Sequence, residues 1–321
     1  MIHDATRAPS AEGVARAAEK LAALIPPTPI LPLEIGGVTL WAKAECLQPI
    51  GAFKIRGAWH RLSDLSAAER ARGVVGVSSG NHAQGVAWAA RRLGIKATIV
   101  MPHDAPKVKL ERVREMGAEV VPYQRPGEDR DAVAEALCAQ TGATLVHAYA
   151  DPWVIEGQGT AGMELSAQMK RWAGGRPERI VTPCGGGGLS AGLALACPDA
   201  EIVPVEPEGW DDVTRSLMAG KILPVVDDPP ATACDALQTL ATRPINFAVL
   251  QERASPGVVV SADEVRAAQR FAFSRLRLVL EPGGAVALAA ALAGKVPLTP
   301  RTAIILSGGN VDPADFANVL G

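Results

Sequence analysis

The sequence has few aromatic residues and almost no excess charge. Phe, Trp and Tyr make up 4% of its 321 residues, and the formal net charge is -2. A chain this close to neutrality lacks the basic surface that attracts nucleic acid or an anionic membrane. No uncharged apolar run approaches the roughly 20 residues that span a bilayer. We therefore expect no nucleic-acid partner and no membrane association.

The sequence also lacks a visible secretory signal and paired cysteines. Its first residues, MIHDATRAPSAEG, contain no apolar stretch of the kind found in signal peptides. The five cysteines are scattered and never form a CxxC pair. Buried free thiols in a reducing compartment fit this pattern better than disulfides or a zinc site. We expect a cytoplasmic protein.

Strand-like and helix-like segments alternate through most of the chain. Val74–Val77 is a β-branched run, and Asn81–Leu93 follows with helical spacing and ends before Gly94. The alternation resumes at Ile180–Pro183 and continues to a strand at Thr302–Leu306. It predicts an α/β fold of parallel sheets flanked by helices, whose ligands bind in the loops that follow strands. Further helices are expected over 107–116, 130–139, 159–171, 189–196, 262–275 and 284–293.

One of these loops carries four consecutive glycines, Gly185–Gly188, between a strand and a helix. Without Cβ atoms, successive backbone N–H groups can point at one anion near the helix N-terminus, so a phosphate is the expected ligand. The pattern is neither GxGxxG nor GxxxxGKS, which disfavours a dinucleotide or a nucleoside triphosphate. The alternative is a flexible turn.

Two further loops after strands carry similar residues. Ser78-Ser79-Gly80-Asn81-His82 follows the strand at 74–77, and Ser307-Gly308-Gly309-Asn310 follows the last strand. Ser79 or Asn81 could simply cap the next helix. Three polar, glycine-bearing loops at strand ends nevertheless favour a concave site for a small polar ligand.

Lys54 lies between the apolar residues Phe53 and Ile55. Desolvation lowers the pKa of a lysine and frees its amine as a nucleophile or a Schiff-base partner. The alternative is a surface lysine whose charged end reaches water.

Together these segments resemble the serine/threonine dehydratase family of pyridoxal-phosphate enzymes, the fold-type II or β-family, which includes serine racemase and threo-3-hydroxyaspartate ammonia-lyase. Gly51–Ala58 resembles its cofactor-attachment motif, Ser78–Gln84 its ring loop, Gly185–Gly188 its phosphate cup and Ser307–Asn310 its pyridine-nitrogen loop. The resemblance covers about residues 25–315 in the family's order. It implies two lobes, each with a mainly parallel twisted sheet: a large cofactor-binding domain of residues 1–50 and 151–321, and a small mobile domain of residues 51–150.

The resemblance also implies which residues hold the cofactor. Lys54 would carry pyridoxal 5'-phosphate as a Schiff base and later remove the Cα proton of the substrate. Phe53 would pack beside the ring, and Asn81 would hydrogen-bond its 3-oxygen. Ser307 would face the pyridine nitrogen without keeping it protonated, which suits β-elimination. The phosphate would be bound by Gly185, Gly186, Gly187 and Gly188.

The implied reaction is α,β-elimination of water from L-threonine or L-serine, which yields a 2-oxo acid and ammonia. The substrate carboxylate would be surrounded by Ser78, Ser79, Asn81 and His82. Serine racemase stays an alternative, with Ser79 as a second acid/base. So does threo-3-hydroxyaspartate ammonia-lyase, for whose second substrate carboxylate Arg130 and Tyr149 are the candidates. The alternatives are a solvated arginine at a helix start and a tyrosine at an interface. A protein that binds the cofactor without catalysis is disfavoured, because both the lysine and the ring loop are present.

A last segment of the resemblance, Val205–Asp212, matches the loop with which many serine racemases and dehydratases bind a divalent cation. The implied ligands are Glu206, Asp212 and the backbone carbonyl of Trp210. Oxygen ligands suit Mg²⁺, Mn²⁺ or Ca²⁺. The alternative is a solvated acidic loop that caps the next helix. The family also implies a homodimer.

Overall fold

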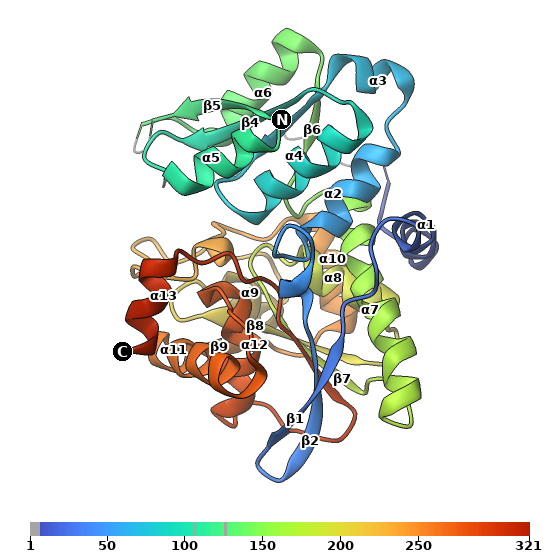
Figure 1. Cartoon of the computed structure of the whole chain (residues 1–321), viewed down its shortest axis with the longest axis vertical. Coiled ribbons are helices and arrows are strands. Elements are labelled where there is room, and N and C mark those ends of the chain that lie inside the picture. The colour runs from blue at the N-terminus through green and yellow to red at the C-terminus, as the bar shows by residue number, and fades with distance from the viewer. Residues whose placement is uncertain (1–6, 106, 125–126) are drawn as a thin grey trace.

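Two separate β-sheets organise the protein (Figure 1). The structure, a computed structural model, describes residues 7–105, 107–124 and 127–321. The six-stranded sheet has the order β1-β2-β10-β7-β8-β9 and the four-stranded sheet the order β5-β4-β3-β6. Among the described residues, every strand pair is parallel except β1 with β2. The expected α/β fold with two mainly parallel sheets is confirmed.

The four-stranded sheet and the helices around it form the small lobe, in the upper part of Figure 1. Its strands are β3 (Val74–Val77), β4 (Ala97–Pro102), β5 (Glu119–Tyr123) and β6 (Thr144–Val146). Its helices are α3 (Ala67–Arg72), α4 (Asn81–Leu93), α5 (Lys107–Glu115) and α6 (Arg130–Thr141).

The six-stranded sheet and its helices form the large lobe (Figure 1). Its strands are β1 (Ile30–Ile35), β2 (Val38–Lys43), β7 (Arg179–Pro183), β8 (Glu201–Pro207), β9 (Val258–Val260) and β10 (Thr302–Ile305). Its longer helices are α1 (Ala11–Ala22), α7 (Pro152–Trp172), α8 (Gly188–Ala196), α9 (Asp212–Ala219), α10 (Pro244–Arg253), α11 (Ala262–Phe271), α12 (Pro282–Leu292) and α13 (Pro313–Leu320). The domain boundaries near residues 50 and 150, and the mobility of the smaller part, stay predictions.

Helix α2 (Lys54–Ser63) packs against α4 of the small lobe and α7 of the large lobe. A Cβ atom on Gly157 of α7 would lie 2.6 Å from the Cα atom of Gly57, so the two helices cross with their backbones in contact. Beside this crossing, the buried Arg56 guanidinium donates to Glu45 at 2.7 Å and to Glu164 at 2.7 Å. Close packing and paired buried charges therefore fix the start of α2, where Lys54 lies.

Two helices differ most from the sequence-based expectation, and the bounds of the others agree to within two residues. Helix α7 begins at Pro152 rather than at residue 159, because the Asp151 side chain caps it and Pro152 fits the first turn. Its first turns are buried on nearly every side, so they show no amphipathic spacing. Helix α11 ends at Phe271, and a π-helical turn continues to Leu276.

Strands β3, β7 and β10 have side chains buried on both faces, as expected for the inner strands of parallel sheets covered by helices. Helix α12 lies within the large hydrophobic core, and its alanines allow it to pack closely on the sheet. Within the described residues, no helix is both long enough and apolar enough to cross a membrane.

Candidate active site

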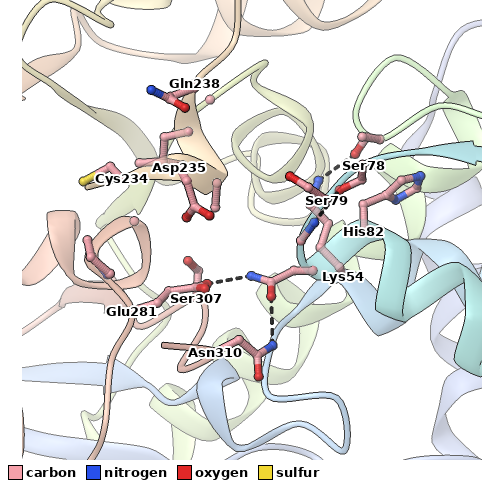
Figure 2. Close-up of a pocket in the computed structure, with 18 of the residues that line it drawn as sticks. Lys54, Ser78, Ser79, His82, Cys234, Asp235, Gln238, Glu281, Ser307 and Asn310 are labelled. Atoms are coloured by element: carbon pink, nitrogen blue, oxygen red, sulfur yellow. Dashed lines mark hydrogen bonds between the residues drawn. The ribbon is translucent and has the colours of Figure 1, made fainter. Parts of the chain in front are cut away.

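A pocket of about 710 Å³ lies between the two lobes. It is lined by the loops that follow β3, β6, β7 and β10, so the strand ends of both sheets converge on it. Figure 2 shows Lys54, Ser78, Ser79 and His82 on one side and Cys234, Asp235, Glu281 and Ser307 on the other. The three polar loops expected to build one concave site do lie together.

Lys54 places its amine in this pocket. Its Nζ atom donates a hydrogen bond to the carbonyl oxygen of Ala148 at 2.6 Å and lies 5.2 Å from the centre of the Phe53 ring. Burial lowers the pKa of Lys54 to about 8. A second lysine of the pocket, Lys109, forms an ion pair with Asp235. Lys54 contacts only a neutral acceptor there, so it is the lysine whose amine is better suited to act as a nucleophile.

The four glycines have no room for side chains. A Cβ atom on Gly186 would lie 2.3 Å from the Tyr149 ring, and one on Gly188 would lie 3.0 Å from the Tyr149 backbone. Gly187 has φ +86°, which favours glycine. It precedes α8 at the N-cap, where no side chain caps the helix. The loop is thus a packed cradle with N–H groups open to an anion, and not a flexible turn.

The N-terminus of α4 is also open towards the pocket. Gly80 is its N-cap, and neither Ser79 nor Asn81 caps the helix, so the capping alternative is wrong. The Ser78 hydroxyl accepts a hydrogen bond from the Gly80 N–H at 3.1 Å. The free N–H groups of the first turn, with the Ser79 side chain beside them, form a site suited to a carboxylate.

The His82 ring is turned away from this role. Its Nε2 atom lies 2.8 Å from the carbonyl oxygen of Val146, an acceptor, so Nε2 carries the proton. Burial lowers the pKa of His82 to about 3, and the ring stays neutral. What His82 offers a carboxylate is its backbone N–H in the first turn of α4.

Arg130 and Tyr149 line the pocket near the carboxyl end of β6. The Arg130 Nε atom lies 3.9 Å from Asp131, and the Nη2 atom of Arg243 lies 3.5 Å from the same carboxylate. The Tyr149 hydroxyl donates to the carbonyl oxygen of Ala241 at 3.2 Å. Two guanidinium groups therefore lie within 4 Å of the Asp131 carboxylate, and of these two Arg130 lines the pocket.

Glu206 and Asp212 lie together at the start of α9. Glu206 accepts hydrogen bonds from the backbone N–H groups of Val213 at 3.0 Å and Thr214 at 2.7 Å. One oxygen of Asp212 accepts from Thr242, while its Oδ1 atom is buried without a partner. Burial, and for Glu206 also the nearby Asp212, raises the pKa of Glu206 to about 8 and that of Asp212 to about 7. Trp210 joins the loop through backbone and indole hydrogen bonds.

Comparisons with known proteins identify the family. The sequence profile described as "Pyridoxal-phosphate dependent enzyme" matches residues 21–308. The chain belongs to this family of pyridoxal-phosphate-dependent enzymes. It is 40% identical over 316 residues to an L-threo-3-hydroxyaspartate ammonia-lyase of Pseudomonas sp, covering 96% of this chain and 97% of that protein. A serine racemase of Schizosaccharomyces pombe is 37% identical over 321 residues, with 97% of both chains covered.

A solved structure of maize serine racemase superposes with a TM-score of 0.90 at 33% identity, covering 97% of both chains. A solved threonine deaminase superposes with a TM-score of 0.87 at 43% identity, covering 95% of this chain and 99% of that chain. The family expected from the four motifs is confirmed, and so is the class of enzyme, a pyridoxal-phosphate-dependent lyase related to ammonia-lyases and serine racemases.

The pocket fits the cofactor of this family. The glycine cradle provides N–H donors for a phosphate, Lys54 provides a nucleophilic amine, and Ser307 and Asn81 line the space between them. The roles of individual residues stay predictions from the motifs. Two pocket residues, Glu281 and Asp235, were not predicted as site residues. Glu281 is the N-cap of α12, a position that Glu rarely takes. The helix was expected only from residue 284, so no sequence signal marked Glu281.

Proposed function

We propose that the protein is an ammonia-lyase that eliminates water from a β-hydroxy amino acid and so releases a 2-oxo acid and ammonia. The observation that supports this most strongly is a lysine amine with a pKa of about 8 in one pocket with a glycine phosphate cradle and an open helix N-terminus. Pyridoxal phosphate, when bound, supplies an electron sink for the negative charge that develops at Cα.

The protein's own residues bind and orient the substrate and move its proton. The substrate carboxylate binds the N–H groups of Asn81 and His82 at the start of α4, with the hydroxyl groups of Ser78 and Ser79 beside it. The Lys54 amine then takes the Cα proton. As the double bond between Cα and Cβ forms, the bond from Cβ to the hydroxyl oxygen breaks, and the hydroxyl leaves as water with the proton that Lys54 took from Cα. The released enamine becomes an imine, which water hydrolyses to the 2-oxo acid and ammonia.

The charge on the Arg130 side of the pocket favours an acidic substrate. Arg130 lines the pocket, its Nε atom lies 3.9 Å from Asp131, and its side chain is 42% exposed, so the guanidinium group is available to a substrate carboxylate. A second carboxylate on Cβ of the substrate would contact this side, whereas serine and threonine present only neutral groups there. A relative described above carries the name L-threo-3-hydroxyaspartate ammonia-lyase. We therefore propose threo-3-hydroxyaspartate as a better substrate than L-serine or L-threonine, the substrates expected first from the motifs.

The test is the rate of ammonia and 2-oxo acid release from these three amino acids, with added cofactor and Mg²⁺. A higher kcat/KM for hydroxyaspartate supports the substrate proposal. A higher kcat/KM for threonine or serine refutes the acidic preference but keeps the reaction class. Conversion of L-serine to D-serine without ammonia release would instead show a racemase, in which Ser79 is the candidate second acid/base. No turnover of any kind refutes the proposed function.

We propose a divalent cation, Mg²⁺ or else Mn²⁺ or Ca²⁺, at Glu206, Asp212 and the carbonyl oxygen of Trp210. The unpartnered Oδ1 atom of Asp212 and two raised carboxyl pKa values are what a missing positive charge would explain. Within the described residues, no cluster of three or more His, Cys, Asp or Glu side chains could hold a metal alone, so the carbonyl and waters would complete the site. The cation would stabilise the loop rather than act in the elimination.

We also propose that two copies of the protein form a homodimer, and that the protein is cytoplasmic. Leu47 and Val279 are 54% and 42% exposed, and the Val279 backbone lies beside Gly309. A second copy of the chain would cover such apolar side chains. Sedimentation of the protein tests this, because a dimer has twice the 33.4 kDa mass of the chain.

A further inference from the structure

Three polar side chains form a hydrogen-bonded chain along one wall of the pocket (Figure 2). The Nδ2 atom of Asn81 donates to Glu281 Oε1 at 2.6 Å. The Nδ2 atom of Asn310 donates to Asn81 Oδ1 at 2.8 Å. Asn81 belongs to the small lobe, whereas Glu281 and Asn310 belong to the large lobe. The chain therefore crosses between the lobes at the residue expected to contact the cofactor ring.

The backbone determines which way the two amide groups face. The carbonyl oxygen of Ile50 can only accept, and it accepts from Asn310 Nδ2 at 2.7 Å. The second N–H of Asn310 then reaches Asn81, so the oxygen of Asn81 must face Asn310. The oxygen of Asn310 faces Arg112, whose Nη1 atom lies 3.4 Å away. Asn81 thus has its nitrogen towards Glu281, with one N–H bound there and one left over.

Glu281 is buried, and its position is fixed by a backbone hydrogen bond and by close packing. Its backbone N–H donates to the carbonyl oxygen of Gly308 at 3.1 Å, and the residue is 5% exposed. A Cβ atom on Gly308 would lie 2.0 Å from Glu281 Oε1, so only glycine leaves room for the carboxyl group.

The carboxyl group lies among few charges. Burial, with the nearby Asp235, raises the pKa of Glu281 to about 8, against the lowering effects of Asn81 and Lys109. At neutral pH it is therefore mostly a neutral acid, whose oxygen accepts from Asn81.

We propose that Glu281 is a positioning residue for the cofactor, which holds the Asn81 amide so that its remaining N–H faces the ring oxygen of pyridoxal phosphate. This rests on the proposed role of Asn81 in the proposed function. Glu281 itself touches neither substrate nor ring in this role. Its contribution passes through Asn81, and the acceptor oxygen of Glu281, not a negative charge, is what matters.

Two matched variants distinguish the effect of the acceptor oxygen of Glu281 from the effect of its side-chain volume. Glu281→Gln keeps an acceptor oxygen, whereas Glu281→Met keeps a similar length and removes that oxygen. The readouts are the Kd for pyridoxal phosphate and the visible absorbance of the loaded protein, both measured without substrate. We expect Glu281→Met to weaken binding roughly 10-fold or more and to shift the absorbance, and Glu281→Gln to stay within about 3-fold of the parent. Should Glu281→Met fail to fold, Glu281→Leu replaces it.

A double-mutant cycle with Asn81→Ala completes the test. If Glu281 acts through Asn81, the loss in Asn81→Ala with Glu281→Met equals the loss in Asn81→Ala alone. Additive losses, an unchanged Kd in Glu281→Met, or equal defects in the Gln and Met variants would each overturn the proposal. Since no substrate is present, a wrong reaction assignment shows only in the ammonia assay and leaves these Kd values unaffected.

Discussion

Replacing Gly186 with alanine is expected to weaken cofactor binding by a clash that can be located. The added Cβ would lie 2.3 Å from Cδ2 and 2.4 Å from Cε2 of the Tyr149 ring. The ring cannot easily yield, because its hydroxyl bonds the Ala241 carbonyl and it meets the His147 ring edge-on with 4.6 Å between ring centres. Overpacking of this kind costs about 1–3 kcal/mol. If the free energy of pyridoxal-phosphate binding falls by this amount, the Kd for the cofactor rises roughly 5- to 150-fold.

Fluorescence titration of the cofactor-free protein with pyridoxal phosphate measures this Kd. Gly175→Ala is the matched control, because its Cβ would meet only the flexible side chain of Arg301, at 3.1 Å. Tyr149→Ala in the Gly186→Ala protein removes the clashing ring and is expected to restore much of the affinity. A parent-like Kd in Gly186→Ala, or no recovery in the double variant, would show that the glycine run is not the phosphate cradle.

Three further predictions concern the other parts of the site. Arg130→Met is expected to lower kcat/KM for threo-3-hydroxyaspartate about 10- to 150-fold, the effect of losing a hydrogen bond to a charged group. The change for L-serine is expected to stay below about 3-fold. Equal losses for both substrates, or no loss, would exclude Arg130 from substrate selection, and Arg176→Met on the surface is the control. Without a cation, the raised pKa values of Glu206 and Asp212 mean that their contribution to the free energy of unfolding is largest below a pH of about 4 and is lost as the pH rises through about 7 and 8, because the buried carboxyl groups must ionise. Mg²⁺ is therefore expected to raise Tm more at a pH of about 8.5 than at a pH of about 6, and Asp212→Asn to abolish this difference; a Tm gain independent of pH or of Asp212 would contradict the cation site. Lys54→Ala is expected to keep its fold, as judged by circular dichroism, and to lose both ammonia release and the visible absorbance of lysine-bound cofactor, whereas continued turnover would exclude Lys54 as the base.

Much of the fold follows from local sequence signals. Helix α4 begins at Asn81 and ends at Leu93 as its spacing predicts, with the left-handed Gly94 after it. The sequence Ser66-Ala-Ala-Glu69 has the spacing of a capping box, and helix α3 begins there with both of its hydrogen bonds. The first turns of α7 escaped prediction because burial on all sides removes the helical period of polar residues.

The site was predictable where it depends on backbone and loops, and less so where it depends on contacts between distant segments. The glycine cradle and the lysine carry their own signal in a few adjacent residues. Glu281 meets Asn81 across 200 positions of sequence, and Arg243 meets Asp131 only once both lobes have folded. The His82 ring turned towards Val146 because a buried backbone carbonyl needed a donor there. No local pattern encodes such pairings.

Lys54 is expected to carry the cofactor, and reduction of the loaded protein identifies the lysine that does. Borohydride fixes the cofactor to its lysine, and peptide mass spectrometry then locates the modified residue. Lys54 and Lys109 both line the pocket, so the experiment discriminates between two real candidates. We expect a reduced pyridoxyl group on Lys54 and none on Lys109 or on the other lysines. Label on Lys109, or on no lysine in a protein that has bound pyridoxal phosphate, would contradict it.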